Sequence, residues 1–126
     1  MQFIASPDDS AFQLPFSAAV RVGDMLYLSG ALGNRPGTLT LVEGGIAAEA
    51  KQAMDNIGRV LALCGLGFSD IVKCTVMLAD MGEWRAFNAV YVTYFAAGRL
   101  PARSAFGASG LALGPRVEVE AMARVG

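Results

Sequence analysis

Arg103 is the residue whose type and position most clearly invite chemistry. It lies in the segment 101–106, at the start of a predicted strand that follows Pro101. A guanidinium that enters a mostly apolar strand is costly unless it is paired with an anion. Its planar, forked donors suit two-point binding of a carboxylate. The residues alone leave two interpretations open: a clamp for a carboxylate ligand, or an internal ion pair with Glu118 or Glu120.

Glu118 and Glu120 are the candidate acid–base groups. They alternate with valines in the segment 117–125, so they share one face of a predicted strand. Their Cα atoms would lie roughly 6.5–7 Å apart. A carboxylate in this place could orient or activate a water, or the two could act as a glycosidase-like acid pair. The alternative is a polar face that contacts water or a neighbouring chain.

Ser29 and Asn88 are weaker candidates for ligand contacts. Ser29 ends a predicted strand and could donate a hydrogen bond, but the chain has no histidine to make it a nucleophile. Asn88 lies among aromatic and aliphatic residues of a predicted helix. An amide in such surroundings indicates a specific hydrogen bond, either structural or to a ligand.

Several kinds of chemistry are disfavoured by what the sequence lacks. The absence of histidine excludes histidine triads and histidine metal sites. Cys64 and Cys74 lie ten residues apart without partners at metal-ligand spacing, so we expect buried free thiols rather than a zinc site. The ten basic residues are scattered singly, which argues against nucleic-acid binding. The glycine-rich segment 30–37 matches no phosphate-binding pattern.

Turn signals divide the chain into strands and helices that must position these residues. Gly23 and Asp24 separate two apolar segments and predict a hairpin over 18–30. Helical spacing of apolar residues predicts helices over 46–65 and 81–96, and the aromatic stripe of the second helix is expected to pack in the core. Further strands are predicted over 71–79, 102–109 and 117–125, with a short one over 39–42.

This order predicts one domain, residues 1–126, of the α/β (α+β) class. A single mixed sheet of about six strands would be covered on one face by two helices. Apolar residues make up 54% of the chain and charged residues 17%, against averages of about 45–50% and about 25%. Such a small domain cannot easily hide so much apolar surface, so we expect a homo-oligomer.

No membrane segment or secretion signal is expected. The longest apolar runs are too short to span a membrane. The first residues carry neither a basic region nor an apolar stretch typical of a signal peptide. We therefore expect a cytoplasmic protein that does not bind membranes.

The segment PARSAFGASGLALGPRVEV, residues 101–119, resembles the Rid family, also called the YjgF or L-PSP endoribonuclease family. Four other segments fit the family in order: LYLSG at 26–30, KQAMDNIGRVL at 51–61, GLGFSDIVKCTVML at 65–78 and FNAVYVTYF at 87–95. The resemblance covers nearly the whole chain. It implies a fold like that of trimeric chorismate mutase, and a homotrimer with ligand clefts between subunits.

The resemblance also implies an activity. Well-known members hydrolyse 2-imino or enamine acids to 2-keto acids and ammonia without a metal or cofactor. By position, Arg103 matches the arginine that binds the substrate carboxylate, and Glu118 matches the glutamate that positions the attacking water. Ser29, Gly30 and Asn88 match positions that line the cleft.

The chain departs from the family pattern at two cleft positions. Phe16 replaces a common tyrosine, and Ala105 replaces a cysteine two residues past the arginine; Ala31 also stands where glutamine is frequent. These changes motivate an alternative substrate, such as that of a deaminase in aromatic or pyrimidine catabolism. A non-catalytic trimer that binds a carboxylate metabolite is a further alternative. Ribonuclease activity is disfavoured, because neither a histidine pair nor a basic stripe is present.

Overall fold

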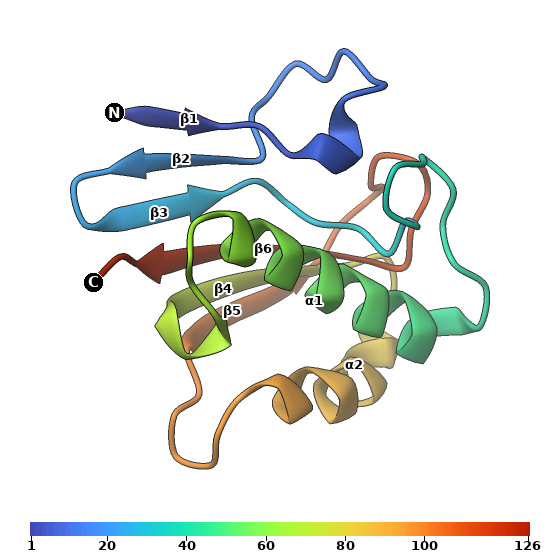
Figure 1. Cartoon of the computed structure of the whole chain (residues 1–126). Helices are drawn as coiled ribbons and strands as arrows, with labels where there is room; N and C mark the ends of the chain where they lie inside the picture. Colours follow the sequence, from blue (N-terminus) through green and yellow to red (C-terminus); the bar gives the residue numbers. More distant parts are fainter.

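A computed structural model describes all residues, 1–126. One six-stranded sheet carries two helices on the same side (Figure 1). The strands are β1 (Gln2–Ile4), β2 (Ala19–Val22), β3 (Met25–Leu28), β4 (Ile71–Leu78), β5 (Ala102–Gly107) and β6 (Val117–Arg124). The helices are α1 (Gly45–Leu63) and α2 (Trp84–Tyr91). Short 3-10 turns occupy Pro7–Asp9, Phe68–Asp70, Met81–Glu83 and Val92–Tyr94. The expected fold class is confirmed.

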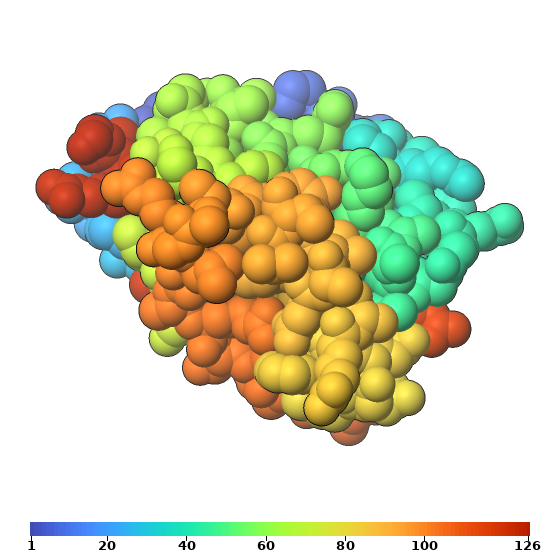
Figure 2. All heavy atoms as spheres, turned by 90° about the horizontal axis from the view of Figure 1, so that it is seen from below, coloured from blue at the N-terminus to red at the C-terminus, as the bar shows by residue number.

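The strands run in the order β1-β2-β3-β6-β4-β5. All neighbours are antiparallel except β4 and β5, which are parallel. Parallel neighbours need a crossover connection, and the segment with α2 supplies it. Seen from below (Figure 2), this connection forms a continuous yellow-to-orange layer beside the green of α1. No helix in the structure is long and apolar enough to cross a membrane.

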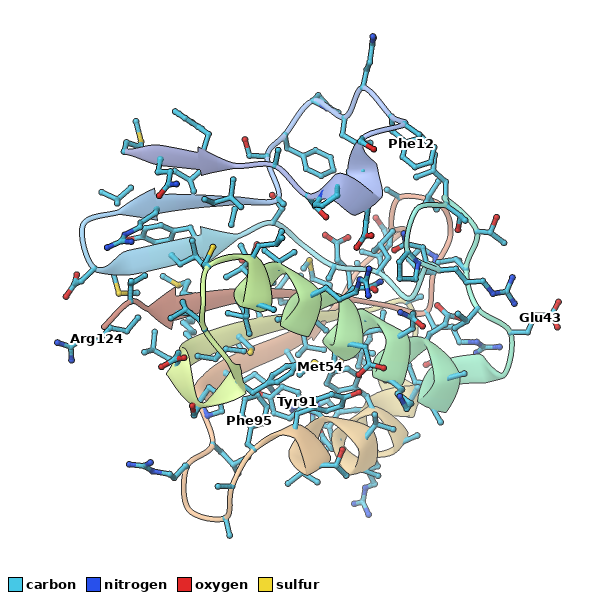
Figure 3. All side chains as sticks on the ribbon, viewed as in Figure 1. Phe12, Glu43, Met54, Tyr91, Phe95 and Arg124 are labelled. Atoms are coloured by element: carbon cyan, nitrogen blue, oxygen red, sulfur yellow. The ribbon has the colours of Figure 1, made fainter.

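The core lies between the helices and one face of the sheet. β6 shows the reason most simply: Val117, Val119 and Ala121 are fully or almost fully buried, whereas the residues between them are not. The buried stripe of α1 and the aromatic residues of α2 cover this face. Figure 3 shows Met54 and Tyr91 in the interior layer between the helices and the sheet, with the partly buried Phe95 beside them.

The opposite face of the sheet, which we call the open face, carries no helix. Strand register places Met77 of β4 between Phe106 of β5 and Glu118 of β6 on this face. On the neighbouring strand, Tyr27 lies opposite Met122. Phe106 and Tyr27 remain exposed. The open face thus combines apolar side chains with charged ones, among them Glu118, Glu120 and Lys73.

Three expectations about the elements need correction. The segment 39–42 is not a strand; Leu41 makes only an isolated bridge to Asn34. The segment 81–96 is helical in three pieces, because two 3-10 turns flank the eight residues of α2. The strand β1 is not predicted from the sequence. The hairpin of β2 and β3 is confirmed, and Gly23 adopts the positive φ of 59° that its tight turn requires.

Candidate functional site

Arg103 lies on the helix-covered face of β5, against the aromatic side chains of α2. Its guanidinium carbon is 4.8 Å from the centre of the Tyr91 ring, 5.8 Å from that of Phe87 and 5.9 Å from that of Trp84. We call these three rings the aromatic cage. Cation–π attraction holds a guanidinium at such distances without using its N–H donors.

No acidic side chain of the protein pairs with the Arg103 guanidinium. It takes part in none of the ion pairs, and it donates no hydrogen bond within the chain. The predicted alternative, an internal ion pair with Glu118 or Glu120, is therefore wrong. A partly buried cation without an anion is unfavourable, so this geometry suits a carboxylate supplied from outside the chain.

Two buried polar atoms on α2 also lack partners. The Oδ1 atom of Asn88 and the hydroxyl of Tyr91 are inaccessible to water and make no hydrogen bond. Their spacing along the helix places them on the face that carries the aromatic cage. Unpaired buried polar atoms are rare in native proteins, which makes Asn88 Oδ1 a candidate ligand contact, whereas the Tyr91 hydroxyl lies next to the Cys74 thiol. Asn88 thus lies on the Arg103 side of the molecule.

Cys74 is the β4 neighbour of Arg103 and is fully buried. Burial raises the pKa of the Cys74 thiol. Burial, together with the adjacent Cys74, raises the pKa of the Tyr91 hydroxyl far above its usual value. Both groups are therefore neutral at pH 7, and the guanidinium is the charge of this cluster. Ala105 follows on the same face and packs against the core. We call Arg103, Asn88 and Ala105 the arginine site.

Glu118 forms a second cluster on the open face. Gly30 lies so close that an added Cβ would collide with the Glu118 carboxylate. Two backbone hydrogen bonds between Ala31 and Val119, of 2.7 and 3.0 Å, fix this approach. Burial raises the pKa of Glu118, and the charge of Glu120 raises it further. The carboxylate is thus a stronger base than an ordinary glutamate.

Ser29 and Phe16 share a cavity wall with Gly30, the residue against which the Glu118 carboxylate packs. The Ser29 hydroxyl donates a 2.6 Å hydrogen bond to the carbonyl of Ser17, which fastens the segment that carries Phe16. A cavity of about 290 Å³ opens here, with Phe16, Ser29 and Gly30 in its wall. We call Glu118, Ser29, Gly30 and Phe16 the acid site.

A buried carboxylate outside the sequence prediction supports this cluster. Glu49 of α1 accepts a 2.9 Å hydrogen bond from the backbone N–H of Arg116, two residues before Glu118. The Arg116 side chain pairs in turn with Glu83 at 2.9 Å. These contacts fix the start of β6. In the sequence, the sign of this role was that Glu49 is a charged residue at a position of the apolar stripe of the predicted helix.

The two sites do not meet within one chain. Cys74 pairs with Arg103, whereas Glu118 pairs with Met77, three residues farther along β4. An odd separation places the two side chains on opposite faces of the sheet. Two strand spacings and three residues of rise separate their Cα atoms by about 14 Å. The aromatic cage was also missed, because the stripe on α2 was expected to serve the core alone.

Comparison with known proteins places the chain. Residues 8–125 match the family model described as Endoribonuclease L-PSP. The chain belongs to this family. Its match to 2-iminobutanoate/2-iminopropanoate deaminase of Mus musculus is 47% identical, covering 86% of this chain and 80% of the mouse protein. RidA of an Antarctic Psychrobacter superposes with a TM-score of 0.90 at 34% identity, covering 99% and 100% of the two chains.

A second solved structure, the YJGF gene product of Escherichia coli, superposes with a TM-score of 0.89 at 31% identity, covering 98% of both chains. These structures confirm the expected family and its fold. In this L-PSP family member, Arg103 has no anionic partner within the chain, and Glu118 lies on the opposite face of the sheet.

Proposed function

We propose that the protein hydrolyses 2-imino or enamine acids to 2-keto acids and ammonia. The observation that carries the proposal is the Arg103 guanidinium, which the aromatic cage holds without an anion. Relatives at 43–47% identity bear the name 2-iminobutanoate/2-iminopropanoate deaminase, which supports the same reaction. The substrate would be a small carboxylate.

In this mechanism Arg103 binds the substrate carboxylate through two N–H donors, and this fixes C2 of the imine. Asn88 and the backbone at Ala105 would contact the same molecule. Glu118 accepts a proton from water as the water oxygen adds to C2. The C=N π electrons move to nitrogen, which takes up a proton from solvent water. Glu118 then gives its proton to this nitrogen as the C–N bond breaks, so that ammonia leaves, and the hydroxyl on C2 releases its proton to solvent as the C=O bond forms.

The substrate would bind between two copies of the chain. Arg103 and Glu118 lie on opposite faces of one sheet, so a single chain cannot bring both to one small molecule. The arginine site of one copy facing the acid site of the next gives a head-to-tail contact that repeats until a ring closes. We propose a homotrimer, with apolar side chains of the open face, such as Phe106 and Tyr27, buried between subunits. Ser29, Gly30 and Phe16 would then line each cleft from the acid side.

Arg103→Ala tests the proposal most directly. The variant should lose ammonia release from freshly generated 2-iminopropanoate and 2-iminobutanoate, because the carboxylate is no longer held. If Arg103→Ala folds normally by circular dichroism and still releases ammonia at the wild-type rate, the proposal is contradicted. Arg85→Ala is a suitable control, since it makes the same substitution at an exposed arginine of α2 that takes part in no ion pair.

A carboxylate-binding protein without catalysis is the second candidate. The unpaired Arg103 favours this candidate as much as it favours an enzyme. Glu118→Gln separates the two. A binding protein would keep its thermal shift with 2-keto acids in both forms and release no ammonia in either. The proposed enzyme loses turnover in the variant and keeps the thermal shift.

The cytoplasmic location stays a prediction.

A further inference from the structure

The cavity beside the acid site is larger than the reaction at C2 requires. It measures about 290 Å³ and lies between the N-terminal segment, the loop after β3, α1 and the loop before β6. Its apolar lining includes Leu14, Phe16, Leu32, Leu39, Val60 and Leu113. Ligand sites typically combine such a lining with a few polar groups.

The cavity reaches Gly30, the residue against which the Glu118 carboxylate packs. Ser29, Gly30 and Ala31 form part of its wall, whereas Glu118 does not. A Cβ added to Gly30 would collide with the Glu118 carboxylate, so the carboxylate lies directly against Gly30. A substrate whose C2 lies at Glu118 and whose carboxylate extends to the arginine of another copy has one substituent left to place. That substituent is the side chain on C2, and the cavity is the adjacent space.

Apolar side chains at the cavity are left uncovered. Phe16 and Leu113 expose about half of their surface, 56% and 52%, and Leu39 exposes 46%. Leu113 also has a φ of 69°, and no other residue except glycines has a positive φ. A leucine tolerates this left-handed conformation poorly. Strain of this kind collects at ligand-binding positions, where the surrounding structure enforces it.

The charges in the cavity wall select against anions. Asp8 and Asp9 lie in the wall, and no basic residue does. Asp8 is neutralised by Arg59 through hydrogen bonds of 2.7 and 2.9 Å. Asp9 has no such partner, and burial raises its pKa, with the charge of Asp8 adding to the shift. An acidic substrate side chain would meet this carboxylate in partly dry surroundings.

We propose that this cavity is the side-chain pocket of the substrate site, and that the protein prefers 2-imino acids with branched aliphatic or aromatic side chains. It disfavours those with acidic side chains, and it turns over 2-iminopropanoate less efficiently because a methyl group leaves the cavity empty. This inference rests on the proposed deaminase function. It adds to that function the part of the site that distinguishes one imine from another.

The test compares imines made in situ by an L-amino-acid oxidase from leucine, phenylalanine, alanine and glutamate. Semicarbazide captures the imine that escapes hydrolysis, so the loss of semicarbazone absorbance reports turnover. The wild-type protein should show a kcat/KM for the leucine and phenylalanine imines about tenfold or more above that for the alanine imine. The glutamate imine should be the poorest substrate.

Val60→Phe should fill the cavity from α1. The variant should lose about tenfold or more in kcat/KM on the leucine and phenylalanine imines, and less than about twofold on 2-iminopropanoate. Val92→Phe is the matched control, because Val92 is exposed on the turn after α2 and outside the cavity. If Val60→Phe fails to fold, Leu113→Gly takes its place. It removes an apolar wall residue and suits the positive φ, and it should show the same selective loss.

The outcomes separate the two proposals. Wild-type turnover of 2-iminopropanoate with no preference for larger imines, or equal losses on every imine in the cavity variants, would overturn the side-chain pocket alone. A wild-type protein that hydrolyses none of the imines would overturn the deaminase function itself.

Discussion

Mixed assemblies of Arg103→Ala and Glu118→Ala subunits should recover activity that neither variant has alone. Arg103 and Glu118 face opposite sides of one sheet, about 14 Å apart at their Cα atoms. A functional cleft would therefore need the arginine of one subunit and the glutamate of the next. In a ring assembled at random from equal amounts of the two variants, each cleft receives an intact pair with a probability of about one quarter.

The assay follows ammonia release from 2-iminopropanoate after the two variants are co-expressed with different tags and purified over both. Specific activity should approach about one quarter of the wild-type value, somewhat more after double-tag selection has removed homogeneous rings. Varying the input ratio should give a symmetric curve with its maximum at equal amounts. Each variant assembled alone should stay at the background rate.

A second mixture serves as the control. Wild-type subunits mixed equally with the double variant Arg103→Ala/Glu118→Ala should also leave about one quarter of the clefts intact. A site contained within one chain would instead give about one half in this control, and nothing in the mixture of single variants. That pair of results would refute the reasoning from strand register.

Four further predictions concern the two sites. Gly30→Ala should displace the Glu118 carboxylate and lower kcat/KM about tenfold or more, whereas Gly110→Ala, whose added Cβ meets nothing within 4 Å, should not. The acidic limb of the kcat/KM profile should lie above the ordinary glutamate pKa, because burial and Glu120 raise the pKa of Glu118; Glu120→Gln should shift the limb to lower pH, and an unmoved limb would contradict Glu118 as the base. At pH 7, Glu118→Gln should be at least as stable to urea as the wild type. A carboxyl group whose pKa is higher in the folded than in the unfolded state makes the protein less stable as the pH rises through that folded-state pKa. Tyr91→Leu should raise KM about two- to thirtyfold, because it opens the aromatic cage. Tyr91→Phe keeps the ring and should leave KM within about twofold. An unchanged stability of Tyr91→Phe would count against the interpretation that the Tyr91 hydroxyl is buried without a hydrogen-bond partner.

The sequence predicted elements best where one face alone is buried. The alternation of β6 identified both its buried valines and the outward direction of Glu118. The helix α1 followed equally well from its apolar stripe. The segment 39–42 misled because its pairing with residues 33–35 is limited to a single bridge, which is too short to form a strand. β1 was missed because three residues at an edge carry almost no periodic signal.

For the site, residue types could be found from the sequence but their distribution over two faces could not. The family resemblance pointed to Arg103 and Glu118 together. The structure separates them, because the strand order inserts β4 between β5 and β6. The aromatic cage could not be predicted from the sequence for a related reason. An aromatic stripe on a helix ordinarily packs in the core, and its contact with the guanidinium exists because β5 places Arg103 against α2.

This separation explains the chemical state of both residues. If Arg103 and Glu118 met within the chain, their ion pair would lower the pKa of Glu118 and occupy the donors of Arg103. Instead, aromatic rings hold the guanidinium without consuming its donors, and burial raises the pKa of the carboxylate. A carboxylate clamp needs free donors, and a general base needs a raised pKa. Placing the two groups on opposite faces provides both properties, and our proposal leaves it to the substrate between two copies to bring them together.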